Sequence, residues 1–203
     1  SEIEQFSVDW RKKFYGKPLA VLFPKDVNEI SCLITLVNTT AGISIVPQGG
    51  NTGLAGGATP NREENQLIIS LKRLNLVRAV DLFNRTLIAE AGCTLIKLQK
   101  EIEKSKLYFP LDFSSRDSAS LGGLLATNAG GLSVLKYGTA KDCCLGLEVV
   151  LPNGEIWNGL KTLRKDNSGY SLKDLFIGSE GTLGVITAAS MRLFSPVEEK
   201  STY

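Results

Sequence analysis

A glycine-rich stretch directly after an apolar run is the feature that most constrains this chain. The run Ile43–Val46 predicts a buried strand, and the stretch that follows it, PQGGNTGLAGG (47–57), contains five glycines. Without a Cβ, glycine permits positive φ angles and lets a ligand come close to the backbone. Consecutive N–H groups in such a turn can form an anion-binding concavity. The pattern predicts a loop that grips a phosphate or diphosphate, with Asn51 and Thr52 as additional polar groups.

Two familiar phosphate loops do not match this stretch. Its glycines follow the spacing Gly50-x-x-Gly53-x-x-Gly56 rather than G-x-G-x-x-G, and the lysine of G-x-x-x-x-G-K-[ST] is missing. A flexible linker is the alternative interpretation, because glycine runs often serve as linkers. Linkers usually carry serine or charge, whereas this stretch follows an apolar strand and contains Leu54 and Ala55. We therefore favour the ligand-binding interpretation.

Composition and charge exclude several classes of protein. The chain has 203 residues, 43% of them hydrophobic and 22% charged, which suits one large or two small globular domains. A net charge of +2 without a basic block argues against nucleic acid as a partner. No apolar run reaches the ~18 residues of a transmembrane helix, and the acidic N-terminus lacks a signal-peptide core.

Histidine and cysteine content limits the chemistry. The chain has no histidine, which excludes Ser–His and Cys–His pairs and histidine metal ligands. Reactions must therefore come from a bound cofactor or another polypeptide. The four cysteines include the adjacent pair Cys143-Cys144, which does not suit a secreted disulfide framework and predicts a reducing, cytoplasmic location.

Hydrophobic periodicity predicts the elements of the first half. Residues 20–23 and 43–46 are expected as strands that flank a helix over residues 27–37. Asp26 should cap this helix, with Glu29 completing a capping box. This arrangement is a βαβ unit, so its two strands should be parallel.

Further strands and one more helix are predicted downstream. Asn153-Gly154 favours a tight hairpin between the strands expected at 147–151 and 155–157. Residues 120–129 suit either a backbone wrapped around a ligand or a helix of small residues packed against a sheet. The expected strands are 67–71, 86–91, 147–151, 155–157 and 189–194, and the expected helix runs from Thr94 to about Lys104.

Four sequence stretches occur together in a recognisable order. They are PQGGNTGLAGG (47–57), SLGGLLATNAGG (120–131), GLEVVLPNGEI (146–156) and LFIGSEGTLGVIT (175–187). Together they resemble the FAD-binding domain of FAD-linked oxidoreductases of the vanillyl-alcohol oxidase and p-cresol methylhydroxylase (PCMH) type. The resemblance is strongest to the branch with D-lactate dehydrogenases, the glycolate oxidase flavin subunit and D-2-hydroxyglutarate dehydrogenase. It covers about Lys17 to Phe194.

The resemblance implies an α+β, PCMH-type FAD-binding fold of two subdomains with FAD extended between them. A small βαβ subdomain would span residues 1–78, and a larger, mainly antiparallel sheet with helices would span residues 79–203. The substrate-binding cap domain of such enzymes is expected to be absent. The chain would then be the flavin half of a longer enzyme or a subunit completed by a partner.

The resemblance also implies which residues bind FAD. The glycine loop would hold the diphosphate, a second segment the flavin and ribityl chain, and a third segment the adenosine end. The loop residues are Gln48, Gly49, Gly50, Asn51, Thr52, Gly53 and Leu54. The second set is Pro110, Leu111, Asp112, Ser118, Ser120, Leu121, Gly122, Gly123, Thr127, Asn128 and Gly131. The third set is Glu180, Gly181, Gly184, Val185 and Ile186.

Some of these assignments have alternatives. Glu180 could instead hold its own turn, since a carboxylate suits ribose hydroxyls or backbone donors better than phosphate. Gln48 and Leu124 stand where relatives often carry arginine and asparagine, so weaker diphosphate binding and the loss of one polar contact are expected. No catalytic residue and no metal ligand is assigned.

The implied function is dehydrogenation of a 2-hydroxy acid, glycolate or D-lactate in type, by hydride transfer to flavin. Electrons would leave to a quinone, a cytochrome or a partner redox subunit, which could attach the protein peripherally to a membrane. The same FAD domain could instead serve alcohol oxidation or alkylglycerone-phosphate synthesis. A non-catalytic nucleotide-binding subunit is a further alternative.

Overall fold

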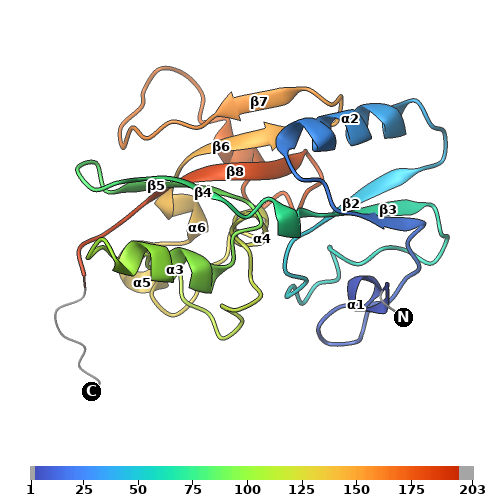
Figure 1. Ribbon diagram of the computed structural model, residues 1–203, viewed down its shortest axis with the longest axis horizontal. Helices are drawn as coiled ribbons and strands as arrows, with labels where there is room; N and C mark the ends of the chain where they lie inside the picture. The colour runs from blue at the N-terminus through green and yellow to red at the C-terminus, as the bar shows by residue number, and fades with distance from the viewer. Residues whose placement is uncertain (1–2, 197–203) are drawn as a thin grey trace.

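The computed structural model describes residues 3–196, and its strands form two sheets (Figure 1). The first is a parallel sheet in the order β1-β3-β2, made of β1 (Ala20–Leu22), β2 (Ser44–Gln48) and β3 (Gln66–Ser70). The predicted parallel direction of β1 and β2 is confirmed, but β3 lies between them and pairs with both.

Helix α2 (Val27–Asn38) connects β1 to β2 as predicted. The Asp26 carboxylate accepts a hydrogen bond from the Glu29 N–H at 2.9 Å, which satisfies one of the free donors of the first turn. The predicted capping box is wrong in one detail. The Glu29 carboxylate accepts its hydrogen bond from the N–H of Lys25 (2.7 Å), one residue before the cap.

The second sheet has five antiparallel strands in the order β4-β5-β8-β6-β7. These strands are β4 (Val77–Asp81), β5 (Thr86–Glu90), β6 (Cys144–Val150), β7 (Ile156–Gly159) and β8 (Val185–Arg192). The hairpin predicted at Asn153-Gly154 is confirmed by the pairing of Val150 with Ile156. Strand β8 begins earlier than predicted, because its pairing with β6 extends back to Val185 opposite Val150.

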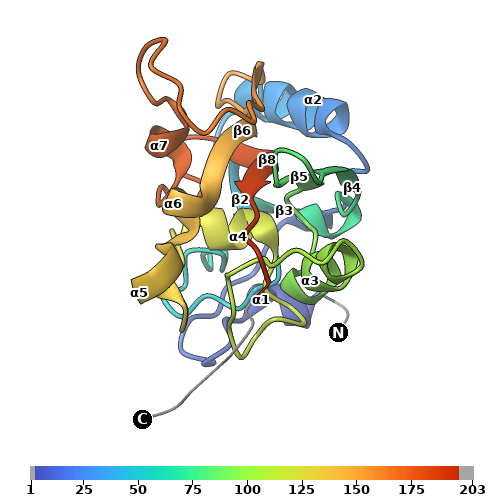
Figure 2. The ribbon, with the colours of Figure 1, turned by 90° about the vertical axis from the view of Figure 1, so that its left-hand side faces the viewer.

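The remaining helices are mostly short. Thr94 accepts a hydrogen bond from the Lys97 N–H and caps α3, whose Leu95, Leu98 and Ile102 are buried. Of the two interpretations of residues 120–129, the packed helix is confirmed for α4, which lies against β8 and β5 (Figure 2). The helices are α1 (Glu4–Ser7), α3 (Leu95–Glu103), α4 (Leu121–Ala126), α5 (Val134–Tyr137), α6 (Ala140–Cys143), α7 (Lys173–Phe176) and the 3-10 helix η1 (Leu71–Arg73).

Helix α2 joins the two sheets. Ser31 on α2 donates a hydrogen bond to the carbonyl of Gly154 in the β6–β7 hairpin at 2.5 Å, and Asn38 donates to Pro152 at 2.6 Å. Ile30 belongs to the same buried cluster as Val149 of β6. The sheets divide the chain between β3 and β4, so the expected boundary at residue 78 falls within β4. The division into two subdomains stays a prediction.

A polar cluster crosses four strands of the antiparallel sheet. The Arg78 guanidinium lies 3.3 Å from a Glu90 carboxylate oxygen and 3.0 Å from one of Glu148, while Thr187 donates to Glu148 at 2.8 Å. Burial acts to lower the pKa of Arg78, but the two carboxylates raise it overall. The side chain of Glu148 is only 8% exposed, so its charge depends on Arg78 for compensation.

The four cysteines carry free thiols. Burial raises the pKa of Cys93 and Cys143 to about 11 and that of Cys144 to about 12. These three side chains are therefore protonated at neutral pH and act as small apolar groups in the core.

Replacing Arg78 by methionine should lower the free energy of unfolding by about 3 kcal/mol, because two largely buried carboxylates would lose their cation. The matched control is Lys17→Met, which removes an ion pair with Glu64 whose side chains are 69% and 51% exposed. That change should cost less than ~1 kcal/mol. Urea unfolding measures both, and equal losses in the two variants would contradict the role of the Arg78 cluster.

Candidate cofactor-binding site

The glycine loop leaves β2 with its main-chain donors unused. Within the described residues, no N–H from Gly49 to Ala58 donates a hydrogen bond to another protein group. Asn51 adopts φ +53° and Gly56 φ +78°, which turns the backbone sharply twice. Backbone N–H groups seldom remain without partners unless water or a ligand takes them. The loop is therefore a set of donors available to a ligand.

The loop packs closely against the segment before α4. A Cβ at Gly50 would overlap the Ser118 carbonyl oxygen, and a Cβ at Gly49 would overlap the Ser120 hydroxyl. Only glycine permits this approach of two backbones. The Ser120 side chain is buried, and its hydroxyl has no hydrogen-bond partner. The structure thus brings together four residues that the sequence assigned to the cofactor.

A cavity of about 340 Å³ adjoins this contact. It is lined by Gly49, Gly50, Ser118 and Ser120 together with Lys72 and Lys97. Sequence reasoning missed the two lysines, whose ammonium groups add positive charge beside the loop. The parallel pairing of β2 and β3 could have indicated Lys72, because strands with the same direction end at the same edge of a sheet.

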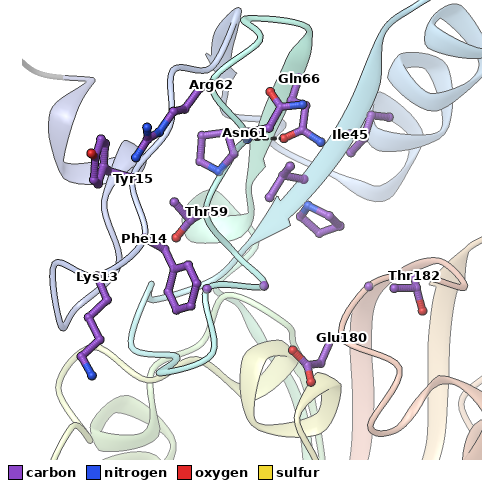
Figure 3. Close-up of a pocket in the computed structure, with 16 residues that line it drawn as sticks. Lys13, Phe14, Tyr15, Ile45, Thr59, Asn61, Arg62, Gln66, Glu180 and Thr182 are labelled. Carbon is purple, nitrogen blue, oxygen red and sulfur yellow. Dashed lines mark hydrogen bonds between the residues drawn. The ribbon is translucent and has the colours of Figure 1, made fainter.

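A larger cavity, of about 590 Å³, lies at the far end of the loop (Figure 3). Gly56 and Gly57 line one part of it, and the turn Glu180–Thr182 lines another. A Cβ on Gly57 would lie 2.7 Å from Glu180 Oε2, so the Glu180 carboxylate rests against the loop. Phe14 and Tyr15 contribute aromatic surface from the N-terminal region.

Helix α4 sets the spacing between the loop and this turn. Ser120 precedes α4 and contacts the loop, as described above. At the other end of the helix, the N–H groups of Gly178 and Glu180 donate to the carbonyls of Leu125 and Ala126 at 3.0 and 2.9 Å. These bonds satisfy carbonyls at the helix C-terminus and fix the turn. Glu180 therefore holds its own turn through the main chain while its carboxylate lines the larger cavity.

Two loop side chains are directed at protein groups. Gln48 is buried, and its Nε2 donates to the carbonyls of Phe6 and Ala58 at 2.9 and 2.7 Å. Asn51 Nδ2 donates to Val8 at 2.8 Å and to Gln5 at 3.2 Å. Their side-chain donors are thus occupied within the protein. Thr52, Gly53 and Leu54 form the tip of the loop, where Gly53 and Leu54 are exposed.

The apolar residues expected to face the cofactor are largely in the core. Each of the four is at most 6% exposed, and they are Leu111, Leu121, Val185 and Ile186. Val185 and Ile186 lie in the centre of the antiparallel sheet, opposite Val150 and Val149. Their side chains are packed in the hydrophobic core, so little of their surface is open to a ligand.

The other predicted residues make contacts with protein groups, both within their own segments and with neighbouring ones. The Thr127 hydroxyl donates to Gly123 at 2.9 Å, and Asn128 Oδ1 accepts from the Lys141 N–H at 3.0 Å. A Cβ at Gly131 would lie 2.6 Å from the Asp112 carbonyl oxygen. Pro110 and Gly122 are buried, and a Cβ at Gly184 would meet Val149 at 2.8 Å.

Comparison with known proteins decides the family. Residues 18–159 match the family described as "FAD binding domain". The chain belongs to this family. FAD is thereby confirmed as the predicted cofactor, and the resemblance inferred from the four sequence stretches is confirmed as well.

Several curated relatives of this FAD-binding domain are 42–45% identical. They include D-2-hydroxyglutarate–pyruvate transhydrogenase of Saccharomyces cerevisiae (42% over 190 residues, 94% of this chain and 38% of the relative). They also include mitochondrial D-2-hydroxyglutarate dehydrogenases of Danio rerio (45%; 93% and 35%) and Bos taurus (44%; 94% and 34%). The chain spans somewhat more than a third of the length of these relatives.

A solved structure supports the fold. An alkyldihydroxyacetonephosphate synthase matches 95% of this chain and 36% of its own with a TM-score of 0.81 at 27% identity. The predicted α+β, PCMH-type architecture is confirmed. Among residues 3–196, no helix is both long and apolar enough to cross a membrane.

Gly50→Ala should destabilise the protein by about 1–3 kcal/mol, because the added methyl group forces the loop away from Ser118. Gly53→Ala is the matched control in the same loop, since a Cβ there meets nothing within 4 Å. It should change the free energy of unfolding by less than ~1 kcal/mol. Urea unfolding of both variants measures the difference, and a Gly50 variant as stable as the Gly53 variant would refute the close packing.

Proposed function

We propose that the glycine loop binds the diphosphate of FAD through the main-chain N–H groups of its first part, Gly49 to Gly53. The observation that carries this proposal is the absence, within the described residues, of any protein acceptor for the N–H groups of Gly49 to Ala58. A diphosphate needs several donors at once, and clustered amides supply them without a lysine. The buried, unpartnered hydroxyl of Ser120 adds a further group suited to the ligand.

The residues present fit the other parts of FAD. The larger cavity suits the adenosine end, because the Glu180 carboxylate there can accept hydrogen bonds from ribose hydroxyls. We assign the flavin end to the two segments 110–112 and 127–131. The remaining residues predicted for the cofactor keep their assignment as part of this proposal.

We further propose that the domain belongs to an oxidoreductase that dehydrogenates a 2-hydroxy acid. FAD, when bound, supplies the acceptor for a hydride. The chain itself would bind and orient the cofactor, and we assign no proton-transferring residue within it. The relatives named for D-2-hydroxyglutarate support this substrate class, since they are more similar in sequence than the synthase.

The partners and the compartment follow from the same proposal. The site for the 2-hydroxy acid substrate would be completed by a cap domain outside these residues. Electrons would leave to an acceptor or a partner redox subunit. Assays of the longer protein with D-2-hydroxyglutarate, D-lactate and glycolate separate the candidate substrates. Free thiols suit the cytoplasm, as predicted, and equally the mitochondrial interior indicated by the names of two relatives.

FAD should copurify with the chain or bind when added, and it should raise the thermal stability. At a concentration 100 times Kd, the gain in unfolding free energy is about 2.7 kcal/mol. Absorbance after desalting and thermal melts with and without FAD measure the two effects. A chain that is folded, takes up no flavin and gains no stability would overturn the proposal.

Gly53→Val tests the loop specifically. The added side chain enters open space in the protein, so folding should be nearly unchanged, but it would obstruct a ligand lying over the loop. We expect FAD affinity to fall about tenfold or more, equivalent to ~1.4 kcal/mol. Ala55→Val, at an exposed position of the same loop, is the control and should retain the affinity. Equal affinities in both variants would place the ligand elsewhere.

A further inference from the structure

The N-terminal arm, residues 3–16, is a folded element beside the glycine loop. A bridge between Val8 and Tyr15 closes it. Inside this closed turn the Asp9 carboxylate accepts hydrogen bonds from the N–H groups of Arg11, Lys13 and Phe14 at 3.0, 2.7 and 2.6 Å. The arm therefore has a defined shape of its own.

The base of the arm is fixed to the segment that follows the glycine loop. A Cβ at Gly16 would overlap the carbonyl oxygen of Pro60, so the two backbones are in close contact. The Lys17 N–H donates to the Asn61 carbonyl at 2.7 Å, and the Arg62 guanidinium lies 4.0 Å from the centre of the Tyr15 ring. The arm is thus held in place independently of any ligand.

The glycine loop directs its two side-chain amides at the arm. Gln48, at the start of the loop, donates to the carbonyl of Phe6, and Asn51, at its first sharp turn, donates to Val8 and Gln5. These acceptors lie more than 40 positions earlier in the sequence. Figure 1 shows α1 and the segment after β2 on the same side of the parallel sheet.

The far end of the loop also touches the arm. A Cβ at Gly56 would lie 2.6 Å from Cγ of Phe14, so the phenyl ring rests on this glycine. Figure 3 shows Phe14 beside the larger cavity. The arm therefore contacts the loop at its beginning, at its turn and at its end, while leaving the main-chain N–H groups in between unused.

We propose that the N-terminal arm is a latch that holds the glycine loop in the shape that binds FAD, with Asn51 and Phe14 as positioning residues. This proposal rests on the proposed function. A glycine-rich segment has much conformational freedom to lose when it binds a ligand. A loop fixed beforehand loses less, which raises affinity. The side chains of Gln48 and Asn51 would then favour FAD binding indirectly, because they fix the loop to the arm.

Coupling between two sites is reciprocal, so FAD must stabilise the arm as much as the arm favours FAD. The arm carries Arg11, Lys12 and Lys13 in succession, all exposed and all suitable for trypsin. We expect FAD to slow tryptic cleavage at these residues in the wild-type chain. Mass spectrometry of the early fragments locates the cut.

Asn51→Gly removes the two hydrogen bonds to the arm but keeps the positive φ angle. We expect it to weaken FAD binding about tenfold and to abolish the protection of the arm. Ala55→Gly adds the same flexibility without touching the arm and should retain both. Asp9→Ala is the second variant: it removes the three hydrogen bonds that shape the arm, touches neither the loop nor a cavity, and should also weaken FAD binding.

The outcomes separate this proposal from the previous one. A wild-type chain that binds no FAD refutes the proposed function itself. A wild-type chain that binds FAD without protecting the arm overturns the latch, whatever the variants do. So does equal FAD affinity in Asn51→Gly and Ala55→Gly. Melting of each variant without FAD identifies any that fails to fold, and the protection measured on the wild-type chain then decides.

Discussion

The proposed binding of FAD depends on a run of main-chain amides that the protein itself leaves without acceptors. Most buried or ordered segments pair their N–H groups in helices, sheets or turns. The glycine loop after β2 does not, and the glycines at its start let it approach the Ser118–Ser120 backbone more closely than any other residue would permit. An anion over this loop would meet several donors at once, which is the arrangement that a diphosphate requires.

The two sheets position the glycine loop next to the Ser118–Ser120 segment and the Glu180 turn. Parallel pairing places the ends of β2 and β3 at one edge, and α2 joins that sheet to the β6–β7 hairpin. Helix α4 then spans the distance from Ser120 to the Glu180 turn. The Arg78 cluster sits in the antiparallel sheet that anchors this turn through β8.

Much of the fold could be predicted from local sequence patterns. The helical spacing behind Asp26, the cap at Thr94 and the turn at Asn153-Gly154 all depend on neighbouring residues, and the structure confirms them. Partners distant in the sequence could not be predicted in this way. No local pattern shows that β3 lies between β1 and β2, or that Val185 already belongs to β8.

In the candidate site, too, features set by neighbouring residues could be predicted and contacts between distant residues could not. Its glycine loop could be located from the sequence, because a glycine cluster directly after an apolar strand is a local pattern. The side-chain contacts of Gln48 and Asn51 could not be predicted, because their partners are carbonyls of the N-terminal arm, more than 40 positions earlier in the sequence. Lys72 was missed because it reaches the loop only through sheet pairing. The assignment of individual residues to FAD stays a prediction.

The most direct measurement is an amide ¹⁵N–¹H NMR titration of the chain with FAD, ADP and riboflavin. ADP shares the diphosphate with FAD, and riboflavin lacks it. The account predicts that the resonances of Gly49, Gly50 and Gly53 shift with FAD and with ADP and stay in place with riboflavin. Binding of FAD that leaves these three amides unshifted would contradict it.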